Sequence, residues 1–278
     1  GYKPRGDGSA RNVAQTQFGA DLKVGLTSNV TLDGAINPDF GQVEADPGVL
    51  NLSAFEQFFA ERRPFFLEGS GIFRYDIDCN DGQCTGLFYS RRIGRAPQLR
   101  NSFGDAASPL QTSIDGAAKI TGRLGNGLSI GLLDAVTERV QGTESRTIEP
   151  LTNYGVMRLQ QDLRGGNSGV GVMVTNTTRQ LDDWTRDVLR SGALTGGFDM
   201  RHRFSQNRFQ LSAQLAGSRV TGSAAAIART QRSNVHLYQR EDASHLAFDS
   251  TKTSLAGSMA QMSIDKQGGG ITRFSTSA

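Results

Sequence analysis

Apolar and polar residues alternate along most of this chain, in short runs that are separated by turns. In the first run Leu22 and Val24 alternate with charged residues, and after a turn at residues 26–29 the alternation resumes. Successive side chains of a β-strand point to opposite faces, so a period of two predicts a strand with one apolar and one polar face. Two such runs around a short turn predict a β-hairpin.

The hairpin pattern recurs along the chain and predicts about five hairpins. The turns inside each hairpin are short, whereas the connections between hairpins are long and polar, as at 138–150, 179–191 and 219–233. Short turns at one end of a sheet and long loops at the other are typical of outer-membrane β-barrels. The paired runs are 18–24 with 30–36, 118–124 with 128–132, 154–163 with 170–174, 194–201 with 209–215, and 253–264 with a return at 271.

The fold class that we predict is all-β: a partial antiparallel up-and-down transmembrane β-barrel with a short helical and loop insertion. The alternative is a soluble β-sandwich or soluble barrel, because their strands alternate too. The apolar faces are rich in small residues, and Lys, Arg, Asp and Gln stand in the middle of strands, which favours a wet lumen over a packed core. Hydrophobic residues make up only 37% of the chain, and no apolar run approaches the roughly 18 residues that a transmembrane helix needs.

Three parts of the chain differ in pattern. Residues 1–15 are polar and charged, and we expect a linker from a missing N-terminal module, since no secretory signal opens the chain. Residues 16–278 form the predicted barrel domain, which we expect to be incomplete at its C-terminus. Within it the alternation stops over residues 38–116, an insertion that we expect to plug or cap the barrel. Residues 52–59 carry apolar side chains at helical spacing, and Pro64 is expected to end that helix.

Charged residues stand beside aromatic ones in the insertion, which predicts a compact element held by ion pairs. We expect an ion-pair network that lines the lumen or locks the plug, with the candidate members Glu56, Arg62, Arg63, Glu68, Arg91 and Arg92. Three further carboxylates, Asp39, Glu44 and Asp46, are candidate oxygen ligands for a divalent cation, the one cofactor that we consider. We favour structural roles for them, because ion-pair networks are the commoner cause of such clusters.

Cys79 and Cys84 are the two cysteines of the chain, and turn residues separate them. We expect a disulfide between them across a tight loop, which suits an oxidising compartment. A zinc site is not expected, because there is no second cysteine pair and the three histidines lie far off in sequence without ligand spacing.

The sequence offers little for catalysis, and we expect a protein that is not an enzyme. Glu56, Glu61 and Glu68 could serve a glycan-processing hydrolase, the alternative function, but nothing sets two of them at the required separation. The net charge of +3 is spread along the chain rather than clustered, so no nucleic-acid partner is expected. Four aromatic residues are candidates for girdles at the membrane interfaces: Tyr154, Trp184, Phe198 and Tyr238.

Three blocks in order resemble a known family: NPDFGQVEAD at 37–46, ERRPFFLEG at 61–69 and FYSRRIG at 88–94. The family's domain of unknown function is described as an outer-membrane barrel and follows a family-9-like carbohydrate-binding module in bacterial proteins. The resemblance implies a pore or transport-related barrel, or a barrel that anchors a surface module, in the bacterial outer membrane. Its partners would be membrane lipid and, through a module outside this chain, a glycan. One position departs from the expected pattern, since Ala60 stands where a proline is expected.

Overall fold

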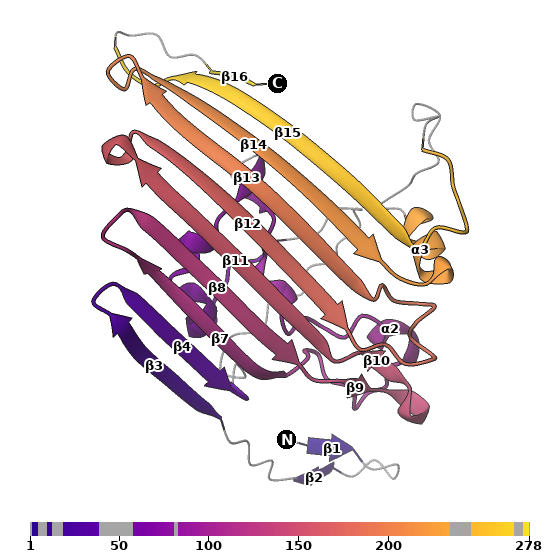
Figure 1. The fold of residues 1–278 in the computed structure, drawn as a ribbon. Coiled ribbons are helices and arrows are strands. Elements are labelled where there is room, and N and C mark those ends of the chain that lie inside the picture. Colours follow the sequence, from indigo (N-terminus) through magenta and orange to yellow (C-terminus); the bar gives the residue numbers. More distant parts are fainter. Residues whose placement is uncertain are drawn as a thin grey trace.

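The computed structural model describes residues 2–4, 10–12, 19–38, 58–80, 83–233, 246–269 and 275–277. Its main element is a ten-stranded antiparallel sheet (Figure 1). Each strand of this sheet pairs with the long strands that precede and follow it along the chain, so the sheet is the predicted up-and-down meander. The strands are β3 (Ala20–Thr27), β4 (Val30–Ile36), β7 (Ile114–Arg123), β8 (Leu128–Thr137), β11 (Thr152–Leu163), β12 (Ser168–Arg179), β13 (Gly192–Phe204), β14 (Phe209–Thr221), β15 (Ser254–Lys266) and β16 (Ser275–Ser277).

The two ends of the sheet differ in the length of their connections, as the sequence predicted. The short turns lie together at one end, at the upper left of Figure 1, and we name it the turn end. Gly127, Gly165 and Gly166 have positive φ there, which tight turns require and glycine adopts without steric cost. The long connections lie together at the opposite end, the loop end, and carry the short hairpin β9 (Val140–Gln141) and β10 (Thr147–Glu149) and the helix α3 (Ala224–Gln231).

The described residues of the insertion between β4 and β7 form four short helical segments and one hairpin, which lie behind the sheet in Figure 1. One expectation for it was wrong: Phe58 to Arg63 is not helical, and a helix begins at Pro64 rather than ending there. Proline suits the first helical position because its missing N–H has no partner there in any case. Residues 51–57 lie outside the described residues. The segments are α1 (Pro64–Leu67), η1 (Ser70–Phe73), η2 (Ser90–Arg92), α2 (Arg100–Phe103), β5 (Asp76–Asn80) and β6 (Gln83–Gly86).

The largest hydrophobic core lies between the insertion and the sheet. Phe66, Phe73 and Tyr75 of the insertion pack against residues of β8, β11 and β12, including Leu133 and Met173. Burying one such side chain contributes about 1.5–3 kcal/mol, so this core holds the insertion on one face of the sheet. A second core at the loop end contains Leu99, Val140, Ile148 and Leu189.

The described sheet is open. Its two edge strands are β3 and β16, and no pairing joins them among the described residues. The all-β antiparallel part of the prediction is therefore confirmed, whereas closure into a barrel is not seen. In the predicted linker, β1 (Tyr2–Pro4) and β2 (Ala10–Asn12) pair as a short hairpin.

Candidate lumen face and its insertion

The face of the sheet that carries the insertion, here named the inner face, is polar outside the hydrophobic core that it shares with the insertion. Lys119 pairs directly with Asp33 on one neighbouring strand and with Leu133 on the other, so all three side chains lie on this face. The direct partners of these residues identify the inner-face positions on the remaining strands. Residues that pair directly across strands share a face, so the polar set can be read from strand to strand. Its charged and amide members are Asp21, Lys23, Asp33, Lys119, Arg123, Arg158, Gln160, Asp162, Arg179, Asp199, Arg201, Arg203, Gln210, Gln214, Gln261 and Asp265.

The opposite face, here named the outer face, is apolar and exposed. Many of its large apolar side chains are between 36% and 66% exposed. A soluble sheet buries its apolar face and exposes its polar one, so the arrangement here is inverted. These exposed residues include Leu22, Val24, Ile36, Leu132, Leu163, Val170, Val172, Val174, Leu194, Phe198, Phe204, Leu215 and Met262.

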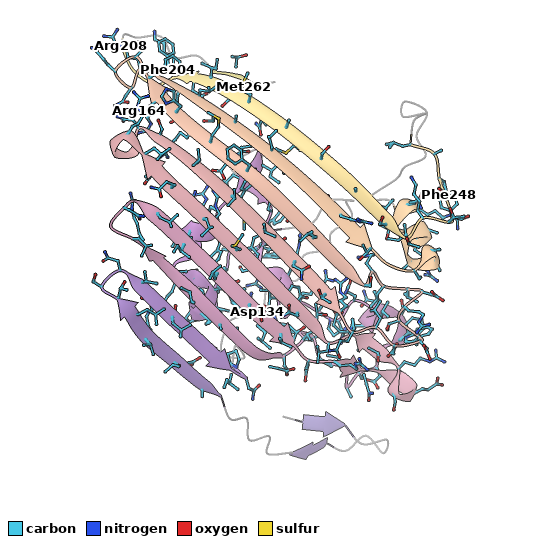
Figure 2. All side chains as sticks on the ribbon, viewed as in Figure 1. Asp134, Arg164, Phe204, Arg208, Phe248 and Met262 are labelled. Atoms are coloured by element: carbon cyan, nitrogen blue, oxygen red, sulfur yellow. The ribbon has the colours of Figure 1, made fainter. Side chains whose placement is uncertain are left out.

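Polar residues bound this apolar surface at both ends. Asp134 lies toward the loop end of β8, where its carboxylate accepts a hydrogen bond from Asn153 Nδ2 at 3.0 Å (Figure 2). Arg208 and Phe204 lie at the turn end (Figure 2), and the Phe204 ring stacks on Phe209 with centroids 5.5 Å apart. Of the predicted girdle residues, Phe198 is on the outer face, but Tyr154 is buried on the inner face. Trp184 packs at the loop end against Phe103, and Tyr238 lies outside the described residues.

Arg63 holds the insertion together from within. Its Nε and Nη2 donate to the carboxylate oxygens of Glu61 at 2.8 and 2.7 Å, and its Nη1 donates to the Ile93 carbonyl at 2.7 Å. The Ser90 hydroxyl donates to the same carboxylate at 2.6 Å. Burial alone would raise the pKa of Glu61, but the hydrogen bonds and charge of Arg63, with the bond from Ser90, lower it to about 2. This cluster joins residues 61–63 to residues 90–93.

Lys119 joins the insertion to the sheet. Its side chain is 1% exposed, and its ammonium donates to the carbonyls of Phe65 and, at 2.7 Å, Glu68. Asp33 on the neighbouring strand lies 3.5 Å away and balances the charge. The Glu68 carboxylate pairs with Lys23, and the hydrogen bond from that lysine lowers the pKa of Glu68. The buried ammonium of Lys119 therefore attaches the α1 segment to the inner face of the sheet.

Two glycines make room for the insertion. The Tyr75 hydroxyl is 2.9 Å from the carbonyl oxygens of both Phe198 and Leu215, and its single hydrogen can be donated to either of them. The Tyr75 ring lies over Gly197. A Cβ at Gly197 would lie 2.6 Å from Tyr75 Cζ, and a Cβ at Gly131 would lie 2.6 Å from Ile72 Cγ2. Both distances are shorter than van der Waals contact, so close approach of the insertion requires glycine at these positions.

Replacing Gly197 with alanine is expected to loosen the insertion. Overpacking of this kind costs about 1–3 kcal/mol, so we expect protease cleavage within residues 64–103 to accelerate roughly tenfold. The matched control is Gly196→Ala on the outer face, where the nearest heavy atom to the new Cβ is 4.0 Å away and no acceleration is expected. Equal cleavage rates in the two variants would contradict the assigned contact with Tyr75.

A row of ion pairs crosses the inner face on the turn side of Tyr75. Arg158 on β11 pairs with Asp199 on β13, and the pair passes over Gly171 of the intervening strand. Asp162 is 3.5 Å from Arg201 across Gly169, and its other oxygen is 2.6 Å from Arg123. The glycines leave space that a side chain would fill, since a Cβ at Gly171 would lie 2.7 Å from Asp199 Oδ2.

The structure separates the charged residues that the sequence grouped. Arg63 pairs with Glu61 and Glu68 pairs with Lys23, in two different clusters, while Arg91 Nη1 donates to the Ala60 carbonyl at 3.4 Å. Arg62 and Arg92 are exposed.

The sequence prediction left out Glu61 as a member of the network, and it omitted the row of ion pairs on the inner face of the sheet. The signal for the row was available as polar residues at every second position in 158–162 and in 199–203. Glu56 lies outside the described residues.

The candidate metal ligands and the cysteine side chains are not described. Asp39, Glu44 and Asp46 lie outside the described residues, and the residues that are described contain no group of three or more His, Cys, Asp or Glu that could hold a metal ion. The backbones of Cys79 and Cys84 pair directly in the β5–β6 hairpin. Directly paired Cα atoms lie about 4.5–5.5 Å apart, within the range of a disulfide, so the bond remains a prediction.

Neither described candidate carboxylate suits a glycan-processing hydrolase. A glycosidase needs a general acid with a raised pKa. The pKa of Glu61 is lowered to about 2 by Arg63 against the opposing effect of burial, and that of Glu68 is lowered by Lys23. Both carboxylates therefore stay ionised and act as ion-pair partners.

A family described as a domain of unknown function (DUF5916) matches residues 4–266. The match includes nearly all of the sheet and the whole insertion. No curated protein and no solved structure matches the chain at a significant level. None of the helices in the described ranges is long and apolar enough to cross a membrane. The chain belongs to the DUF5916 family of domains of unknown function.

Proposed function

We propose that this chain forms the wall of an outer-membrane β-barrel whose lumen is restricted by the insertion, and that the protein is a restricted pore for small polar solutes. The observation that carries this proposal is the inversion of the two faces. Exposed apolar residues such as Val172 and Leu215 suit lipid contact, and buried charges such as Lys119 and Arg158 suit a polar interior.

Two further features support the proposal. The long strands have 10 to 13 residues from β7 to β15, which is enough for the tilted span of about 9–11 residues that a membrane strand needs. The short turns gather at one end and the long connections at the other, as in barrels with periplasmic turns and external loops. The part of the inner face on the turn side of Tyr75 carries charged residues, which favours a restricted pore over a barrel that only anchors a module.

Fractionation of cells that express the protein tests the proposal. We expect the protein in the outer membrane, soluble only with detergent, and with a different gel mobility when the sample is not boiled. The unboiled form should run faster, because a closed barrel resists unfolding by the detergent. A protein that stays in the aqueous fraction and shows one mobility under both conditions would overturn the proposal. Conductance in planar bilayers then separates a pore from an anchoring barrel.

A further inference from the structure

The row of ion pairs borders a cavity of about 250 Å³ on the inner face. Its lining includes Arg123, Ser129, Gln160, Asp162, Asp199 and Arg201. This volume is below the roughly 300–1,000 Å³ of pockets for drug-sized ligands, so it suits a smaller solute. Along β13 the cavity residues Asp199 and Arg201 follow Gly197 toward the turn end, so the cavity lies between the insertion and the turns.

The four charged side chains that line the cavity balance one another, and the buried Arg158 that pairs with Asp199 adds a positive charge beside it. The guanidinium groups of Arg123, Arg158 and Arg201 face two carboxylates, those of Asp162 and Asp199. One positive charge is therefore in excess among these groups. Small anions are attracted to such a site, and a planar guanidinium offers paired donors that match a carboxylate or phosphate.

Two arginine donors at this site lack acceptors. Arg201 Nε and Arg158 Nε are buried and have no hydrogen-bond partner within the described part of the chain. The Arg158 side chain as a whole is 2% exposed and is held between Asp199 and the ring of Tyr75, with its Cζ 5.3 Å from the ring centroid. A buried donor without an acceptor costs about 1–3 kcal/mol, and an oxyanion bound beside Arg201 would remove part of this cost.

The other polar groups that line the cavity can form hydrogen bonds with hydroxyl groups of a bound solute. Ser129 and Gln160 supply a hydroxyl and an amide, and Asp162 and Asp199 supply acceptors. We propose that this cavity binds a small solute with one oxyanion, a carboxylate or a phosphate, on a hydroxyl-rich body. The proposal rests on the proposed function, because it names the solute class that the restricted lumen would admit.

Equilibrium dialysis of the full chain in detergent tests this, with radiolabelled glucuronate, glucose 6-phosphate and glucose as probes of similar size. Low ionic strength is used because salt screens exposed charges. We expect at least one of the two anions to bind about tenfold or more tightly than glucose, and their ranking identifies the oxyanion. Arg201→Gln should reduce that affinity about tenfold, as should Arg123→Gln. The matched control is Arg203→Gln, which removes the same charge from the same face of β13 outside the cavity and should leave binding unchanged.

Three probes that bind alike, or an Arg201→Gln variant that binds the anion as the parent does, would overturn the inference. The heat-dependent mobility of the same preparations reports separately on the barrel. A mobility shift without anion preference refutes the site and leaves the barrel proposal intact. Anion binding that depends on Arg201 in a protein without the shift supports the site and refutes the barrel.

Discussion

Replacing Val172 with arginine is expected to lower the free energy of unfolding in lipid vesicles by about 2–4 kcal/mol, the cost of an arginine at the centre of a membrane barrel. Val172 lies on the outer face in the middle of β12, paired with Leu159 on one side and Phe198 on the other. These neighbours are apolar, so an arginine at this position would have no polar partner in the hydrocarbon. Unfolding by urea can be followed through the fluorescence of the single tryptophan, Trp184.

Thr178→Arg is the matched control on the same strand and the same face. Six residues at about 3.3 Å each place it roughly 20 Å along a tilted strand from Val172, close to the interface of a membrane. Its partners Asn153 and Gly192 are polar or small. We expect Thr178→Arg to cost no more than about 1 kcal/mol. If Val172→Arg cost as little, the outer face would not contact lipid, because surface substitutions in a soluble sheet stay within about 0.5 kcal/mol.

The strands and turns could be predicted from sequence because their signals are local. The alternation around residues 20–36, for example, contains the strand, its two faces and its turn within a few residues. The same holds for the turn at Gly165 and Gly166. A period of two reports only which residues share a face, and the structure agrees with the sequence on that point for the first four predicted hairpins. The return of the fifth, predicted at residue 271, lies outside the described residues.

The partners of the charged residues could not be predicted, because they depend on register between distant segments. Glu61 meets Ser90 from 29 positions away, and Arg158 meets Asp199 from 41 positions away across a strand that lies between them. The different burial of Arg62 and Arg63 could not be predicted for a similar reason. Only one of the two side chains is buried, and burial follows from the path of the insertion rather than from composition.

Removing the carboxylate of Asp199 is expected to have the largest effect of any single change on the inner face. Asp199→Ala leaves the guanidinium of Arg158, which is 2% exposed, without its charged partner. Breaking one side of a buried ion pair costs about 3–5 kcal/mol, because the remaining charge cannot be solvated. The exposed pair of Arg186 and Asp183 is the control, and Asp183→Ala should leave the unfolding curve unchanged, since solvent already screens both groups.

The double variant Arg158→Met with Asp199→Ala separates a buried pair from a simple packing defect. With both charges removed, the methionine side chain can fill the space beneath Tyr75, and most of the lost stability should return. Arg158→Met alone should cost less than Asp199→Ala, because the side chain of Asp199 is 23% exposed and water can solvate it. Additive losses in the double variant would mean that the two residues do not form a coupled pair. The row of charges across Gly171 would then be a set of independent polar groups, and the free-energy argument for a polar lumen at this position would fail.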